Sequence, residues 1–255
     1  MKERAFTLVE LLVVVGIIAI LATLLVSAVR GGRESGDSVQ CTNHLRVLAA
    51  ANLRYAAEHG GRFCPAQEKT NRLRWHGERQ HATAKFDPAK GFLAPYLGRE
   101  ARVKICPSFH DMIKGADSFE NGSGGYGYNA VYVGGSPASK WEGELAAAIA
   151  NPSATIMFTD TALSVGTGIQ EYPFAEPWQW VSPDGKLSGT LSPSVHFRHR
   201  GTANVAWCDG HVSSEKPSKL GDTNLYGGDD AKHQIGWIGP EDENGWWNPR
   251  FQSSQ

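Results

Sequence analysis

The hydrophobic pattern divides the chain into an apolar run, an amphipathic segment and a mixed remainder. The apolar run extends from Phe6 to Val29 behind a short leader, residues 1–5, and Glu10 is the only charge inside it. This run is long enough to cross a bilayer as a helix, which takes about 20 apolar residues. Over residues 30–59 the core-type positions follow helical spacing at Leu45, Leu48, Ala49, Asn52, Leu53 and Ala56. We predict one long N-terminal helix, transmembrane over residues 6–29 and amphipathic over residues 30–59.

Two groups of glycines bear on the course of this predicted helix. Gly31, Gly32 and Gly36 lie just beyond the apolar run, where each costs about 1 kcal/mol relative to Ala and permits a bend or local melting of the helix. A plain loop between anchor and domain is the alternative for the same residues. The Gly60-Gly61 pair predicts the end of the helix, since glycine readily adopts the left-handed conformation of a helix C-cap.

Residues 60–255 show a different pattern, in which short apolar runs alternate with Gly, Pro, Asn and Asp. The whole chain contains 29 Gly and 13 Pro. This pattern predicts a β-rich domain with long loops and at most a short helix at residues 145–150. The candidate strands are residues 103–106, 126–133, 155–159, 195–198, 203–208 and 211–213. We therefore predict an α+β fold, in which an antiparallel sheet packs on the part of the long helix outside the membrane.

Glu10 carries the strongest functional signal. A carboxylate in hydrocarbon is costly unless it is neutralised or paired with a cation. Two other readings remain open. Glu10 lies near one membrane face and its carboxylate could reach the headgroups, or the run is a secretory signal, because Val26-Ser27-Ala28 has the small-residue spacing of a cleavage site.

The leader MKERA followed by FTLVE resembles the N-terminus of type IV prepilins and pseudopilins. That resemblance implies that a membrane peptidase and methyltransferase cuts between Ala5 and Phe6 and methylates the new amino group. It also makes Glu10 the residue of assembly, paired with the Phe6 amine of a neighbouring subunit. The family usually has Gly at the position of Ala5. Lys2 and Arg4 predict a cytoplasmic N-terminus, and hence a single-pass inner-membrane protein with a periplasmic domain.

A second motif, His199 followed after nine residues by Asp209-Gly210, is similar to the signature of a pseudopilin-associated domain of Planctomycetes and Verrucomicrobia. Asp209-Gly210 predicts a two-residue hairpin turn with positive φ at the glycine. We expect His199 to lock this hairpin by a hydrogen bond to the Asp209 carboxylate or to the turn backbone. The alternative is a divalent metal site made by His199, Asp209 and His211.

Four cysteines, Cys41, Cys64, Cys106 and Cys208, would meet an oxidising compartment in an exported domain. The sequence leaves their pairing open: Cys41 with Cys106 and Cys64 with Cys106 are equally acceptable, and buried free thiols are the alternative.

Two further features of the sequence suggest ligands. Acidic residues gather between Gly221 and Gly245, where they form either a calcium loop without EF-hand spacing or a solvated acidic loop: Asp222, Asp229, Asp230, Glu241, Asp242 and Glu243. Eight tryptophans offer either core volume or exposed platforms for glycans, among them Trp178, Trp180, Trp237, Trp246 and Trp247. We expect no cofactor apart from this possible calcium.

Composition narrows the function classes. A formal net charge of -1 with 20% charged residues gives no basic surface for nucleic acid. GxSxG, HExxH and paired CxxC motifs do not occur in the sequence, so we expect no enzyme activity. We predict a structural subunit of a type II secretion or type IV pilus-like filament, whose partners are the processing enzyme, the membrane and other pilin-like subunits. The alternative is a membrane-anchored adhesin or tip subunit that binds a glycan or envelope partner through Trp-rich loops.

Overall fold

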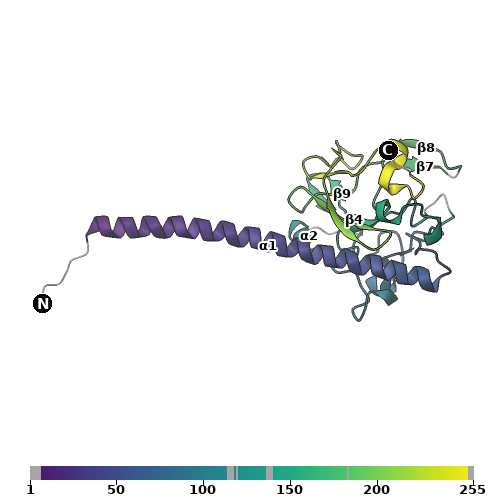
Figure 1. The fold of residues 1–255 in the computed structure, drawn as a ribbon, viewed down its shortest axis with the longest axis horizontal. Coiled ribbons are helices and arrows are strands. Elements are labelled where there is room, and N and C mark those ends of the chain that lie inside the picture. The colour runs from purple at the N-terminus through teal and green to yellow at the C-terminus, as the bar shows by residue number, and fades with distance from the viewer. Residues whose placement is uncertain (1–6, 114–117, 119, 136–139, 183, 252–255) are drawn as a thin grey trace.

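The protein is described by a computed structural model over residues 7–113, 118, 120–135, 140–182 and 184–251. Its most prominent element is a single helix of 51 residues, α1 (Leu8–Glu58). The N-terminal half of α1 projects from the rest of the molecule, and the C-terminal half lies along the globular domain (Figure 1). A long helix on antiparallel sheets makes this an α+β protein with a pilin-like layout, as predicted.

The sequence accounts for both ends of α1. Thr7 caps the start: its hydroxyl oxygen accepts a hydrogen bond from the Glu10 amide at 3.2 Å, and the Glu10 carboxylate accepts one from the Thr7 amide at 2.9 Å. At the other end Gly60 has φ 63°, and the Gly61 amide donates to the Ala56 carbonyl at 2.8 Å. The predicted glycine stop is therefore confirmed.

α1 runs through Gly31, Gly32 and Gly36, so the predicted long helix is continuous here, and neither local melting nor the alternative loop is found. At Gly31 the domain supports the helix from outside: Arg200 Nη2 donates to the Gly31 carbonyl at 2.8 Å. Tertiary contact here offsets the low helix propensity of glycine.

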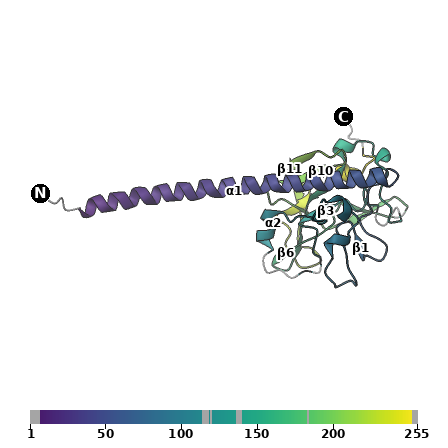
Figure 2. The same ribbon diagram turned by 90° about the horizontal axis from the view of Figure 1, so that it is seen from below.

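The C-terminal half of α1 packs on the central sheet (Figure 2). Leu45, Leu48, Ala49 and Ala56 are buried at the predicted spacing, in one core cluster with Tyr128 and Phe158 of the sheet. Asn52 is also buried: its Nδ2 donates to the Tyr128 hydroxyl at 3.0 Å, and its Oδ1 accepts from the Cys64 amide at 2.8 Å. This polar pair fixes the helix on the sheet, because a buried amide is costly without partners.

The central sheet has four antiparallel strands in the order β11-β10-β4-β3. These are β3 (Tyr126–Tyr128), β4 (Ile156–Asp160), β10 (Ala203–Trp207) and β11 (Val212–Glu215). A three-stranded sheet in the order β12-β13-β9 contains β9 (Val195–His196), β12 (Lys219–Leu220) and β13 (Ile235–Trp237).

Smaller elements complete the domain. Three two-stranded sheets pair β1 (Leu73–Arg74) with β2 (Gly77–Glu78), β5 (Leu163–Val165) with β6 (Gly168–Gln170), and β7 (Gln179–Val181) with β8 (Leu187–Thr190). Apart from α1, the described α-helix is α2 (Pro107–Met112), and the 3-10 helices are η1 (Pro88–Lys90), η2 (Ala94–Tyr96), η3 (Ala146–Ala148), η4 (Pro152–Ala154) and η5 (Asp242–Trp247).

Several predicted elements differ from those observed. Residues 103–106 form no strand, and Cys106 instead caps the start of α2. The strand predicted over residues 126–133 ends at Tyr128, because Asn129 closes a turn: its carbonyl accepts from the Gly134 amide at 2.8 Å and its Oδ1 from the Tyr132 amide at 3.3 Å. The short helix predicted at residues 145–150 is a 3-10 turn, η3.

Candidate functional site

The projecting half of α1 is apolar on every side and is exposed in the isolated chain. Its large side chains from Leu8 to Val29 are about half to three-quarters exposed, ranging from 44% at Val14 to 78% at Leu8. Within the described residues, α1 is the one helix long and apolar enough to cross a membrane. A helix that is hydrophobic all round suits lipid or the interior of a helix bundle, not water.

Glu10 lies in the first turn of this projecting half. Its carboxylate accepts hydrogen bonds from the Thr7 amide at 2.9 Å and from the Thr7 hydroxyl at 2.8 Å. Both donors are neutral, so they satisfy the oxygens without compensating the negative charge. Unless the carboxylate is protonated or reaches the headgroups, a cation has to come from outside the described helix. Ala5 and Phe6, the predicted cleavage residues, lie outside the described residues.

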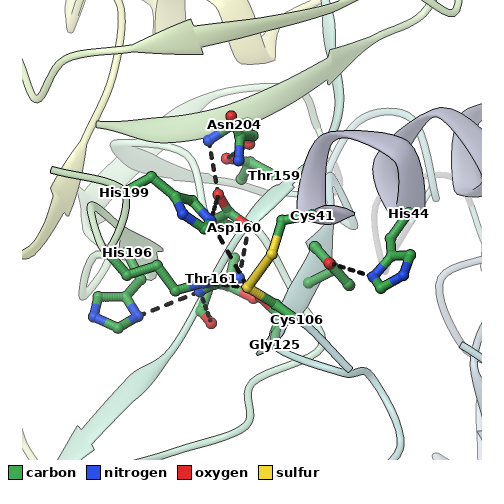
Figure 3. A network of polar contacts seen from close by, with 12 residues as sticks. Cys41, His44, Cys106, Gly125, Thr159, Asp160, Thr161, His196, His199 and Asn204 are labelled. Carbon is green, nitrogen blue, oxygen red and sulfur yellow. Dashed lines mark hydrogen bonds and ion pairs between the residues drawn. A yellow bond between two sulfur atoms is a disulfide. The ribbon is translucent and has the colours of Figure 1, made fainter. Parts of the chain in front are cut away.

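A buried polar network joins β4, the segment after β9 and α1 (Figure 3). Asp160 at the end of β4 accepts from Arg198 Nη2 at 2.6 Å and from the Asn204 amide at 2.7 Å. The side chains of Asp160 and Arg198 have 0% exposure. The remaining Arg198 donors reach the Gly125 carbonyl at 2.6 Å and the Thr161 carbonyl at 3.2 Å. A buried ion pair is tolerated only when its other lone pairs and protons are satisfied in this way.

The disulfide lies against this network. Cys41 of α1 is bonded to Cys106 at the start of α2, which settles the pairing that the sequence left open. Arg198 Nε lies 3.3 Å from the Cys106 sulfur, and His199 Nε2 lies 3.7 Å from it. Cys64 and Cys208 are buried free thiols, and burial raises the pKa of both. The disulfide attaches α1 to the start of α2, and the ion pair packs against it through Arg198.

His199 does not lock the hairpin as predicted. Its Nε2 lies 3.4 Å from Asp160 Oδ2 in the buried network, and its amide and carbonyl pair with Thr202 in a local turn. Burial lowers the pKa of His199, an effect that Asp160 opposes and Arg198 reinforces. The Asp209 carboxylate instead accepts from the His211 amide at 3.0 Å, and its Oδ1 lies 2.7 Å from His211 Nδ1.

For the Asp209-Gly210 turn, the predicted conformation of the glycine is confirmed, but the predicted loop length is wrong. Gly210 has the expected positive φ, at 94°. The loop holds three residues instead of two, because the Trp207 amide bonds the His211 carbonyl at 3.0 Å and the Gly210 amide bonds the Trp207 carbonyl at 2.9 Å. Such a loop is a turn closed by a residue in the left-handed region, which explains the glycine.

The predicted metal residues are separated. His199 is buried beside Asp160, whereas Asp209 and His211 form a partly exposed pair of their own. Among the described residues, Cys41, Cys106 and His199 are the one group of three metal-ligating side chains whose ligand atoms lie within 4.8 Å of one another. Two of these are joined in the disulfide, so their thiolates are not free to bind an ion.

The acidic tail does not form such a group within the part of the chain that the structure describes. Asp230 is buried, and its Oδ1 accepts from the Ser164 hydroxyl and, at 2.9 Å, from Asn224 Nδ2. The Asp229 carboxylate accepts from the Lys232 amide at 2.9 Å. Both acids therefore serve local structure.

The tryptophans named in the sequence lie mainly in the core. Trp178, Trp237 and Trp247 are buried in the second core cluster, where Trp178 and Trp237 stack with ring centroids 4.8 Å apart. Trp180 and Trp246 are half-buried. These rings mostly supply core area, and a glycan platform would have to rest on the last two.

Sequence reasoning missed two residues of the buried network, Asp160 and Arg198. A signal for Asp160 existed, since a carboxylate two positions after the apolar residues 156–158 of a predicted strand has to find a donor. Arg198 lies between His196 and His199, and the prediction for this segment used His199 but not the arginine.

Comparison with known proteins bears on the N-terminus. The model of the prokaryotic N-terminal methylation motif matches residues 1–26. No curated protein matches the chain, and no solved structure matches it. The signature read at His199 to Gly210 has no counterpart in these findings. The chain thus carries a prepilin-type N-terminus on a membrane-anchoring helix, which supports a precursor of the type IV pilin or pseudopilin kind.

Proposed function

We propose that the chain is a structural subunit that is cut before Phe6, N-methylated there, and built through α1 into a type IV pilus-like or type II secretion filament. The observation that carries the proposal is the coincidence of the methylation motif at residues 1–26 with an exposed apolar half-helix that contains one carboxylate. Packing such half-helices together would bury their apolar surface and supply each Glu10 with the cation of a neighbour.

The Phe6 amine of a neighbouring subunit is the partner that we assign to Glu10. This amine exists only after cleavage, so processing would precede assembly. The pair would also set the axial offset between neighbouring helices, as a single polar position does in coiled coils. In this scheme the domain is periplasmic, the anchor crosses the inner membrane once, and the processing enzyme performs the chemistry. For this chain we propose neither catalysis nor a cofactor, and no observation favours the adhesin alternative.

Glu10→Gln tests the proposal. The variant keeps the shape and the contact with Thr7 but removes the charge. We expect it to be inserted and cut before Phe6 as in the wild type, with an N-methylated start found by mass spectrometry of the membrane-extracted protein. Crosslinked oligomers and filament incorporation should fall at least tenfold.

Glu100→Gln is the matched control, because Glu100 is a carboxylate whose partners, Arg102 and Lys104, lie on the domain surface. Normal incorporation of Glu10→Gln at matched expression would refute the pairing. A mature chain that starts near Val29 would instead identify a secretory signal and remove the anchor.

A further inference from the structure

Several large apolar side chains outside α1 are exposed on the globular domain. Among the described residues, the large hydrophobic side chains exposed outside α1 are Met112, Val165, Leu187, Leu225 and Tyr226. Leu225 is 95% exposed and Tyr226 61%. A monomeric soluble surface rarely concentrates such side chains without a partner.

Leu225, Tyr226 and Val165 are neighbours, and we call these three residues the apolar tip. The Gly166 amide donates to the Tyr226 carbonyl at 3.2 Å, and Val165 pairs with Gly227 across an isolated bridge. In Figure 2, β6 and α2 are both drawn at the end of the domain nearer to the projecting half of α1. The tip, on the β5–β6 turn and the loop bonded to it, therefore belongs to that end, and Met112 lies there too as the last residue of α2.

This end of the domain lies close to the end of the apolar run. Arg33 of α1 pairs with Asp111 of α2 at 3.3 Å, and Arg200 donates to the Gly31 carbonyl. With a rise of 1.5 Å per residue, Gly31 and Arg33 lie only about 3 and 6 Å beyond Val29 along the helix axis. One headgroup layer is about 5–7 Å thick. When the apolar run spans a bilayer, Arg33 is therefore level with the headgroups, and α2 lies within the reach of one arginine side chain from that level.

The loop that carries Leu225 and Tyr226 is held by its own hydrogen bonds. Asn224 Oδ1 accepts from the Tyr226 amide at 2.9 Å and from the Gly228 amide at 3.2 Å, while its Nδ2 donates to the buried Asp230 at 2.9 Å. The structure thus presents Leu225 outward on a supported backbone. The facing turn, residues 165–168, contains no charged side chain.

The chemistry of the tip fits a lipid interface. A leucine beside a tyrosine places an apolar side chain and an amphipathic ring at the depth where tyrosine is enriched in membrane proteins. The exposed Asp222 and Asp229 flank the loop, so attraction to anionic lipid does not contribute and the contact is an apolar one.

We propose that the apolar tip is a second membrane contact, inserted into the interface of the same bilayer that α1 crosses. The contact would restrict tilting of the domain about the point where α1 leaves the membrane. It requires only that α1 spans the bilayer, not that a filament forms, so the proposed function and this inference can fail separately.

The test uses the full chain reconstituted at one copy per phosphatidylcholine nanodisc, with an environment-sensitive fluorophore on Leu225→Cys. Leu187→Cys is the matched control, since it is an exposed leucine on β8, away from the α2 end (Figure 1). Lipids that carry a nitroxide just below the headgroup should quench the label at position 225 at least threefold more than the label at position 187. Adding Val165→Ser and Tyr226→Ser to Leu225→Cys should reduce that quenching. Such a reduction would show that the side chains of the tip, and not the fluorophore, drive insertion.

Equal quenching at positions 225 and 187 would overturn the proposal. A change in the fluorescence of the label at position 225 that appears only with several copies per disc would also overturn it. The tip would then contact a second copy of the chain. Wild type treated with the same fluorophore gives the background from the buried thiols of Cys64 and Cys208.

Discussion

Asp160→Asn removes the anionic half of the buried ion pair that lies beside the disulfide. The variant leaves the Arg198 guanidinium with 0% side-chain exposure and with two carbonyl oxygens, those of Gly125 and Thr161, as its main acceptors. Breaking a buried pair from one side costs about 3–5 kcal/mol. We expect a loss near the lower end, about 3 kcal/mol, because those carbonyls still solvate the charge. Such a loss is a large part of a stability of about 5–15 kcal/mol.

Urea unfolding of the full chain in detergent measures the effect, with tryptophan fluorescence reporting on the core around the buried Trp178, Trp237 and Trp247. Arg198→Met and the double variant complete the cycle. Because the double variant leaves no buried charge from this pair, it should lose less stability than the two single losses added together, by at least about 1 kcal/mol. A loss below about 1 kcal/mol for Asp160→Asn, or strict additivity in the cycle, would show that the pair does not hold the fold as argued.

Three other changes probe different parts of the domain. Cys106→Ser opens a loop with a sequence separation of 65, and the chain-entropy relation gives a loss of about 4 kcal/mol under oxidising conditions; an unchanged urea midpoint would contradict it. Gly210→Val places a β-branched residue at φ 94°, with its β-carbon 3.2 Å from Leu53, and should cost about 1–3 kcal/mol; a neutral result would mean that the turn relaxes freely. Burial, reinforced by Arg74 and Arg79, holds the pKa of His76 well below its ordinary value of 6.5. The unfolded chain therefore gains a proton at His76 below about pH 6.5 that the folded chain resists, so folding stability falls on acidification, and His76→Leu should flatten that fall in unfolding measured from pH 7 to 5.

Local patterns in the sequence were enough to predict α1 and its projecting apolar half. Within one helix, residues that are close in the sequence are also close in space. The sequence therefore predicts the apolar run, the spacing of Leu45, Leu48 and Ala49, and the stop at Gly60-Gly61. The positive φ of Gly210 is likewise a property of one turn. For the same reason the prepilin-type N-terminus is recognisable from residues 1–26 alone.

Only the tertiary structure decided which side chains meet across the domain. The sequence placed His199 with Asp209, ten positions away, but the register of β4 and β10 and the close approach of α1 bring it to Asp160. The pairing of Cys41 with Cys106 and the contact of Gly31 with Arg200 likewise join segments that are far apart in the chain. Such contacts depend on how a helix and several short strands pack together, and that packing is set by the volumes and buried polar groups of the whole core, which no local pattern in the sequence specifies.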